Sequence, residues 1–75
     1  MDLATVLMGL HASEISCGMQ MSREDGIEVW LGGGGNLTLD NRRFGIGEMD
    51  EAARWLDHKA RMLYPESDYA KGRRS

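Results

Sequence analysis

Residues 48–64 read EMDEAARWLDHKARMLY and are followed by Pro65. At about 100° per residue, the apolar side chains of this segment fall on one stripe and the charged side chains fall opposite, which predicts an amphipathic helix. Acidic residues crowd its first turn, where the helix dipole favours negative charge, and proline cannot continue it. We expect this helix to cover the rest of the fold with its apolar stripe. The stripe consists of Met49, Ala52, Ala53, Leu56, Ala60 and Leu63.

The outer face of the same helix is charged in a regular way. Asp50 precedes Arg54 by four residues, and Asp57 precedes Arg61 by four. An acid placed four residues before a base supports a helix, so we expect both ion pairs to form. His58 lies on this outer face as well.

A shorter helix is predicted at the start of the chain. Asp2 can cap it, and an apolar stripe at helical spacing follows. Gly9 within the stripe costs about 1 kcal/mol relative to alanine, so this helix depends on tertiary packing. We expect Trp55 and Met62, which flank the stripe of the long helix, to pack under the first helix or the C-terminal tail. The first stripe consists of Leu3, Val6, Leu7 and Leu10.

Two segments then alternate apolar and polar side chains, as half-buried strands do. Their apolar positions are Ile15, Cys17, Met19 and Met21 in the first and Ile27, Val29 and Leu31 in the second. A two-residue loop at 25–26 would put these sets on opposite faces, because residues directly opposite each other share a face. A three-residue loop, Glu24-Asp25-Gly26, puts both sets on one face and places glycine where the turn needs a left-handed residue. We therefore expect Met21 to pair with Val29, and Met19 with Leu31.

A run of four glycines at 32–35 predicts a second turn. Leu37 and Leu39, separated by Thr38, predict a third strand that runs on toward Phe44. The expected fold class is α+β with the order α-β-β-β-α, a three-stranded antiparallel meander with both helices packed on one face as a two-layer sandwich. The other face of the sheet is expected to be open. It would carry Ser16, Gly18, Gln20, Ser22, Glu28, Trp30, Thr38 and Asp40.

A chain of 75 residues is long enough for one small domain, which buries roughly 60% of its unfolded surface. We expect a single α+β domain over residues 1–70 and a disordered basic tail over residues 71–75. The lone Cys17 cannot form an intrachain disulfide and favours a reducing, cytoplasmic setting. No basic region precedes the first apolar segment, and no apolar run is long enough to span a bilayer. We expect neither a signal peptide nor a membrane partner.

The residues capable of chemistry form no catalytic or metal-binding motif. His11, Cys17 and His58 are far apart in the sequence, and Cys17 falls on the predicted core face, where a free cysteine acts as a small hydrophobe. The glycines at 32–35 lead into a strand, whereas a phosphate-binding loop leads into a helix N-terminus. We therefore expect no enzymatic activity, no cofactor and no bound metal.

Charge is distributed unevenly along the chain. The net charge is −3, from nine basic and twelve acidic residues. Three of the nine basic residues lie near the C-terminus, namely Lys71, Arg73 and Arg74. Residues 1–70 therefore contain six basic and twelve acidic residues. An acidic body suits a basic protein surface better than it suits nucleic-acid phosphates, although solubility also favours net charge away from zero.

The candidate partner-binding residues follow from this charge. Trp30, among small polar residues on the open face, is the candidate apolar anchor. An alternative is that Trp30 packs over the sheet edge, or against Phe44 or the tail. The acidic candidates come from the hairpin and the long helix, and they are Glu24, Asp25, Glu28, Glu48, Asp50, Glu51 and Asp57.

The order α-β-β-β-α, at about this length, resembles the double-stranded-RNA-binding domain. That family reads RNA partly through basic residues at the start of its last helix. The corresponding positions here are Glu48, Asp50 and Glu51, which would repel phosphate. The resemblance therefore implies a fold and not RNA binding. A nucleic-acid-associated role, the alternative function, would depend on Arg42, Arg43 and the basic tail.

In size and charge the whole chain is also similar to small acidic inhibitors encoded by phages and mobile elements, including the type I anti-CRISPR proteins. No motif carries this resemblance. It implies a non-enzymatic interaction protein that inhibits a complex by binding its basic nucleic-acid-binding surface, for example a CRISPR surveillance complex. Either a monomer or a homodimer would fit, and a structural homodimer could hide the open sheet face across a two-fold axis.

Overall fold

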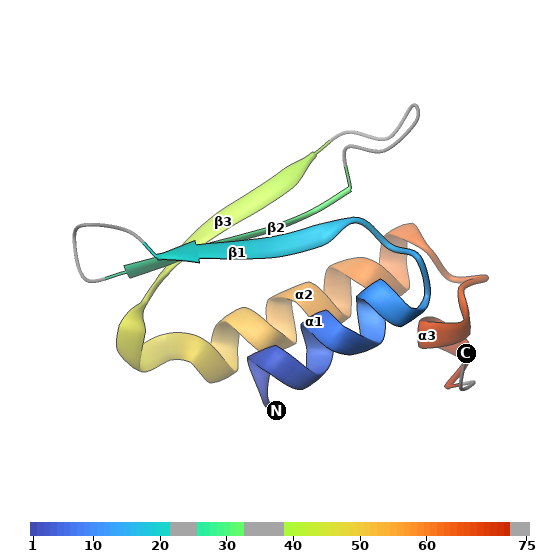
Figure 1. Ribbon diagram of the computed structural model, residues 1–75, viewed down its shortest axis with the longest axis horizontal. Coiled ribbons are helices and arrows are strands. Elements are labelled where there is room, and N and C mark those ends of the chain that lie inside the picture. Colours follow the sequence, from blue (N-terminus) through green and yellow to red (C-terminus); the bar gives the residue numbers. More distant parts are fainter. Residues whose placement is uncertain (22–25, 33–38, 73–75) are drawn as a thin grey trace.

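The computed structural model describes residues 1–21, 26–32 and 39–72. The strands form one antiparallel sheet in the order β1-β2-β3, and α1 and α2 lie side by side against one of its faces (Figure 1). This confirms the predicted α+β fold with the order α-β-β-β-α, to which a short C-terminal helix is added. The elements are α1 (Leu3–Ala12), β1 (Cys17–Met21), β2 (Gly26–Leu31), β3 (Asp40–Gly45), the 3₁₀ turn η1 (Ile46–Glu48), α2 (Met49–Leu63) and α3 (Asp68–Lys71).

The start of α1 is capped as its sequence predicts. The Asp2 carboxylate accepts hydrogen bonds from the backbone N–H and the hydroxyl of Thr5, at 2.9 and 2.8 Å. These bonds lower the pKa of Asp2 because they favour its charged form. The stripe of α1 then faces the core, where Leu3, Val6 and Leu10 are buried.

The end of α1 turns sharply into β1. The backbone N–H of Ile15 donates to the Leu10 carbonyl and that of Glu14 to the His11 carbonyl, both at 2.9 Å. These two bonds form a Schellman motif, which satisfies carbonyls that the helix end leaves without partners. The motif requires a left-handed residue, and Glu14 occupies that position with φ 62°.

The pairing of β1 with β2 differs from the predicted register by two residues. Met21 lies opposite Ile27 instead of Val29. The predicted loop Glu24-Asp25-Gly26 is therefore wrong at Gly26, which belongs to β2 and pairs with Gly45 of β3, whereas Glu24 and Asp25 lie outside the described residues. A shift of two residues leaves every side chain on its predicted face, since the side-chain period of a strand is two. The hydrophobic pattern determines which face of the sheet each side chain takes, but it does not distinguish two registers that differ by two residues. The buried residues that share the helix-covered face are Cys17, Ile27, Val29 and Leu31.

The prediction for β3 was wrong about its faces. Asp40 lies opposite Leu31 and is therefore on the helix-covered face, not on the open one. The error came from Leu39, which the alternation assigned to the core but whose side chain is 52% exposed. Phe44 is the residue of β3 that enters the core. Two other residues predicted for the open face lie outside the described residues, namely Ser22 and Thr38.

The core under α2 uses only the middle of the predicted stripe. Met49 and Leu63 are exposed, contrary to prediction, because the sheet and α1 cover the central turns of α2 and not its ends. Met62 is 62% exposed and does not pack as expected. Trp55 does pack, but against Phe44 of β3, with ring centroids 6.2 Å apart, rather than under α1 or the tail. The completely buried residues of α2 are Ala52, Ala53, Leu56 and Ala60.

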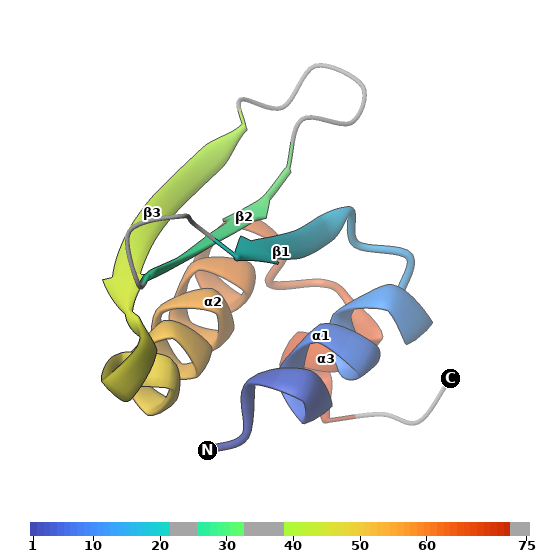
Figure 2. The same cartoon turned by 60° about the vertical axis from the view of Figure 1, so that its left-hand side comes forward.

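α3 docks beneath α1 and α2 through Tyr69 (Figure 2). The Tyr69 hydroxyl donates to Asp57 Oδ1 at 2.6 Å, and the Arg61 guanidinium lies 5.3 Å from the centre of its ring. The ring also abuts Gly9 of α1, where a Cβ atom would lie 3.1 Å from Cε1. Burial and the neighbouring Asp57 raise the pKa of Tyr69. Gly9 thus makes room for a side chain that connects three helices.

The C-terminal helix α3 reaches one residue past residue 70, the predicted end of the domain. Lys71 is the last residue of α3, and Gly72 caps that helix with φ 71°. Lys71 Nζ lies 2.8 Å from a Glu66 carboxylate oxygen. The rest of the predicted tail, residues 73–75, is outside the described part of the chain. Within the described residues, no helix has the length and apolar character needed to cross a membrane.

Candidate functional site

Trp30 lies on the open face of the sheet, opposite Gly18 in the ladder between β1 and β2. A Cβ atom at Gly18 would lie only 2.5 Å from Cζ2 of Trp30, so the indole covers the space that a side chain would fill. Aromatic rings that cover a glycine on a neighbouring strand help to hold sheet edges in register. Trp30 is half-buried as a result. The sequence left two alternatives for Trp30, a partner-binding anchor or packing over the sheet edge. Its contact with Gly18 of the edge strand β1 is packing of the second kind.

Beside the indole, the open face is hollowed into a shallow depression of about 230 Å³. Trp30 and the exposed Leu39 supply its apolar part. A carboxylate and two amides supply its polar part, so the surface combines an apolar contact area with a negative charge. The lining residues are Gln20, Glu28, Trp30, Leu39 and Asn41.

The negative charge of Glu28 is only partly neutralised by its neighbour Arg43. Arg43 lies opposite it on β3, with Nε 3.8 Å from Glu28 Oε2. An exposed ion pair of this kind contributes about 0–1 kcal/mol, because water screens both groups and both side chains lose freedom. A cation brought by a partner could therefore take the place of Arg43 at little cost.

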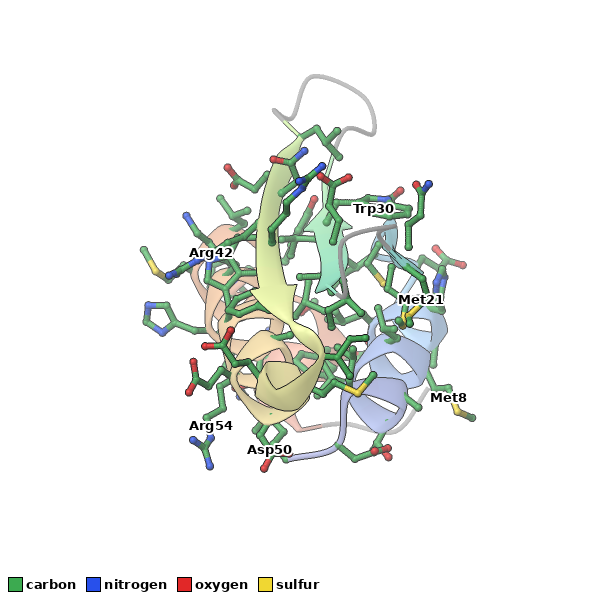
Figure 3. All side chains as sticks on the ribbon, turned by 90° about the vertical axis from the view of Figure 1, so that its left-hand side faces the viewer. Met8, Met21, Trp30, Arg42, Asp50 and Arg54 are labelled. Atoms are coloured by element: carbon green, nitrogen blue, oxygen red, sulfur yellow. The ribbon has the colours of Figure 1, made fainter. Side chains whose placement is uncertain are left out.

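The acidic residues at the start of α2 lie in the other layer of the molecule. Glu48 accepts a hydrogen bond from the Gly45 backbone N–H at 2.8 Å, and Asp50 Oδ1 lies 4.0 Å from the amino terminus of the chain. Glu51 is exposed in the first turn. In Figure 3, Asp50 lies at the helical side and Trp30 above the sheet. The candidate residues are thus divided between two sides of the molecule.

The remaining acidic candidates belong neither to the residues around Trp30 on the open face nor to the acidic residues at the start of α2. Asp57 accepts bonds from Tyr69 and from Arg61, whose Nε lies 3.1 Å from both carboxylate oxygens. This confirms the expected pair with Arg61 and gives Asp57 a structural role between α2 and α3. The expected pair of Asp50 with Arg54 is not among the ion pairs of the described residues. Two hairpin candidates lie outside the described residues, namely Glu24 and Asp25.

The basic pair of β3 does not form one basic patch. Arg43 extends over the open face beside Glu28. Arg42 lies opposite Val29, on the other face, and its guanidinium is 5.1 Å from the centre of the Phe44 ring. Successive residues of a strand point to opposite faces, so these two arginines cannot grip the same phosphate group.

The histidines and the cysteine are separate in space as well. Cys17 is buried, its Sγ lies 3.9 Å from the Leu7 carbonyl oxygen, and burial raises the pKa of its thiol. His11 and His58 are exposed on α1 and α2. Among residues 1–21, 26–32 and 39–72, no three His, Cys, Asp or Glu side chains gather as metal ligands would.

Sequence reasoning missed Leu39, Asn41 and Arg43 as residues of the open face. The signal that would have found them is Phe44, the one aromatic residue of β3. If Phe44 faces the core, every second residue before it faces the same way, and the residues between them face out. The prediction had instead assigned the two faces of this strand from Leu37 and Leu39, which precede it.

Known proteins do not add to this picture. Comparisons of the chain with models of protein families, with curated proteins and with solved structures found no match.

Proposed function

We propose that this chain is a non-enzymatic interaction protein that binds a basic surface of a protein partner through the open face of its sheet. The observation that supports this most directly is the depression beside Trp30. It combines the half-buried Trp30 and the exposed Leu39 with the accessible carboxylate of Glu28. That combination suits a lysine or arginine side chain, which has an apolar stem and a charged end.

In the proposed contact, the stem of the partner's basic side chain lies against Trp30 and Leu39, and its charged end reaches Glu28. The face of the indole adds a cation–π contribution of about 0.5–2 kcal/mol. The partner's cation takes over the role of Arg43, which lies 3.8 Å from Glu28 in the free protein. The acidic residues at the start of α2 lie on the helical side of the molecule, so they do not take part in this contact (Figure 3). They steer a basic partner toward the protein instead of binding it.

The most specific form of the proposal is an inhibitor that competes with nucleic acid for a basic surface. A type I anti-CRISPR role, with a CRISPR surveillance complex as target, is the form that the similarity in size and charge implies. Its test is to ask whether the protein displaces DNA from the complex that it binds, and whether added DNA displaces the protein. A partner that binds DNA equally well with and without the protein would contradict the inhibitor role.

The binding face can be tested with a lysine-rich peptide as the probe. Backbone NMR signals should shift around Trp30, Glu28 and Leu39 on titration. The substitution Glu28→Gln should weaken binding up to about fivefold, because an exposed ion pair is worth up to about 1 kcal/mol. Leu39→Ala should weaken it less, and since Leu39 is exposed the fold should persist.

Glu51→Gln is the matched control, because it removes one negative charge from the helical side. It should change the affinity much less than Glu28→Gln does, since salt largely screens an exposed charge that is distant from the contact. If the peptide shifts signals at the start of α2, and Glu51→Gln weakens binding as much as Glu28→Gln does, the open face is not the binding surface.

The nucleic-acid-associated alternative has less support, because Arg42 and Arg43 point to opposite faces. A gel shift at several salt concentrations separates the two functions. Duplex binding that persists after deletion of residues 71–75 would argue for the nucleic-acid role and against the proposed one.

A further inference from the structure

The two edges of the sheet differ in charge. β1 forms one edge, and its five residues, Cys17–Met21, include no charged residue and no proline. β3 forms the other edge and carries Asp40, Arg42 and Arg43. Proteins commonly place charges on edge strands, because these hinder pairing with a strand of another chain. Only the β3 edge has this protection.

The hydrogen bonding within the sheet shows which groups β1 leaves free. The Gly32 backbone N–H donates to the Ser16 carbonyl at 2.9 Å, at the position next to the pair Cys17–Leu31. In an antiparallel ladder, residue pairs that exchange both bonds alternate with pairs that exchange none. The backbone groups of Ser16, Gly18 and Gln20 therefore point to β2. Those of Cys17, Met19 and Met21 point away from the sheet, as three donors and three acceptors in a row.

The helix next to this edge is uncharged as well. α1 reads LATVLMGLHA and has no acidic or basic residue apart from His11. Its Met8 is 72% exposed, and Met21 at the end of β1 is 58% exposed. Figure 3 shows both methionines on the same side of the molecule, with Arg42 and Arg54 on the other. Apart from His11 and the acidic residues at its two ends, Asp2 and Glu14, α1 thus adds an uncharged surface beside the free backbone groups of β1.

We propose that a second copy of this chain binds here, by antiparallel pairing of β1 with β1 about a two-fold axis at Met19. This register places Met19 opposite Met19 of the second copy, and Cys17 opposite Met21 of the second copy. It brings together the residues whose N–H and C=O groups point outward, so all six outward groups of each strand find partners. Directly opposite residues share a face, so both helical layers lie on the same side of a continuous six-stranded sheet.

A second copy fits this edge better than a different protein does. A charged partner would find no opposite charge on β1 or α1, whereas two copies bring no like charges together there. The register is also complementary to itself, as the contact of a two-fold dimer must be. A standard interface buries about 800 Å² per partner, roughly a sixth of the 5076 Å² surface of this chain. β1 alone is too short for that, so the α1 helices of the two copies, with Met8, must also meet. The open face with Trp30 stays free in this dimer.

Sedimentation measurements test the dimer. The wild-type protein should have a mass near twice the 8.4 kDa of the chain at high concentration and dissociate on dilution. Met21→Lys places a charge on the edge, and Met21→Pro removes one of the outward N–H groups without touching the ladder to β2. Both variants should be monomers with an unchanged circular dichroism spectrum. Met62→Lys, the same change at an exposed methionine of α2, should still form the dimer.

Amide hydrogen exchange of the wild-type protein gives a second test that needs no variant. The amides of Gly18 and Gln20 should be protected at all concentrations, and those of Cys17, Met19 and Met21 only where the dimer forms. A wild-type protein that stays monomeric at every concentration would overturn the proposal. So would a dimer that persists in both Met21 variants without protection of the three outward amides, because its contact must then lie elsewhere, for example on the open face.

Discussion

The two long helices lie side by side on the same sheet, yet they differ in almost every other respect. α1 has 10 residues, large buried side chains and an uncharged outer face. α2 has 15 residues, mostly alanine in its buried stripe, and a charged outer face that includes Asp50, Glu51, Arg54 and Arg61. One helix fills the core with Leu3, Val6 and Leu10, and the other approaches the sheet closely because its alanines are small.

The difference shows that charge is not what keeps a helix in place in this fold. Within the described part of the chain no ion pair involves α1, and the helix is fixed by hydrogen bonds at its ends and by packing along its length. α2 has the ion pair between Asp57 and Arg61 and an acidic first turn, each worth up to about 1 kcal/mol. We infer that both helices depend on the shared core, and that Asp57 and Arg61 of α2 in addition hold α3 in place through Tyr69.

The largest expected effects come from the core that the helices share. Leu10→Ala in α1 and Leu56→Ala in α2 remove completely buried side chains, so each should lower the free energy of unfolding by about 2–5 kcal/mol. Urea titration monitored by circular dichroism measures both. His11→Ala and Met62→Ala, at exposed positions of the same two helices, are the controls and should change stability by less than about 0.5 kcal/mol. If either leucine substitution were as harmless as its control, that helix would not belong to the common core.

The next effect concerns the side chain that connects the helices. Gly9→Val would push a branched side chain into the Tyr69 ring, since even a Cβ atom at this position would lie 3.1 Å from Cε1. The expected loss is about 1–3 kcal/mol, because overpacking forces neighbours out of their preferred positions. In a Tyr69→Ala background the same substitution should be neutral or stabilising, since the obstacle is gone and valine is a better helix former than glycine. An equal cost in both backgrounds would mean that Tyr69 does not dock against α1.

The sequence predicted the fold because the patterns that it rests on are redundant. The stripes of both helices and the alternation of two strands all place their apolar residues against one core, and a register shift of two residues leaves that arrangement intact. The errors fall where a pattern has few repeats. Two leucines before β3 gave the wrong phase for Asp40, and the ends of the α2 stripe, Met49 and Leu63, extend beyond the elements that could cover them.

The candidate site was less accessible to sequence reasoning. Glu28 and Trp30 were correctly placed on one face of β2, because alternation within a single strand is a local property. The grouping of Trp30 with the acidic residues of the long helix could not be judged, since it depends on how the layers stack. The contact of Trp30 with Gly18 depends on a cross-strand register that differs from the predicted hairpin.

A smaller effect should distinguish the hydrogen bond of Tyr69 from its packing. Tyr69→Phe keeps the ring against Gly9 but removes the hydroxyl that donates to Asp57, at a cost of about 1 kcal/mol. The raised pKa of Tyr69 also predicts a pH dependence. Above pH 10 the unfolded chain loses the phenol proton while the folded chain retains it, so wild-type stability should fall as the pH rises. That part of the decline should be absent in Tyr69→Phe and present in Tyr64→Phe. An identical decline in wild type and Tyr69→Phe would show that other groups cause it.

The smallest expected effect is an increase in stability at the end of α1. Glu14 adopts φ 62°, a left-handed conformation that costs a residue with a Cβ atom roughly 1–2 kcal/mol. Glu14→Gly removes this strain but gives the unfolded chain more freedom, which takes back about 0.5–1 kcal/mol. The net gain should be about 0.5–1 kcal/mol, seen as a melting temperature a few degrees higher. Ser13→Gly is the matched control, because Ser13 has φ −91° and gains nothing from glycine, so stability should fall there. If both substitutions destabilised the protein equally, the carboxylate of Glu14 would contribute a contact that outweighs its strain, and α1 would depend on a charge after all.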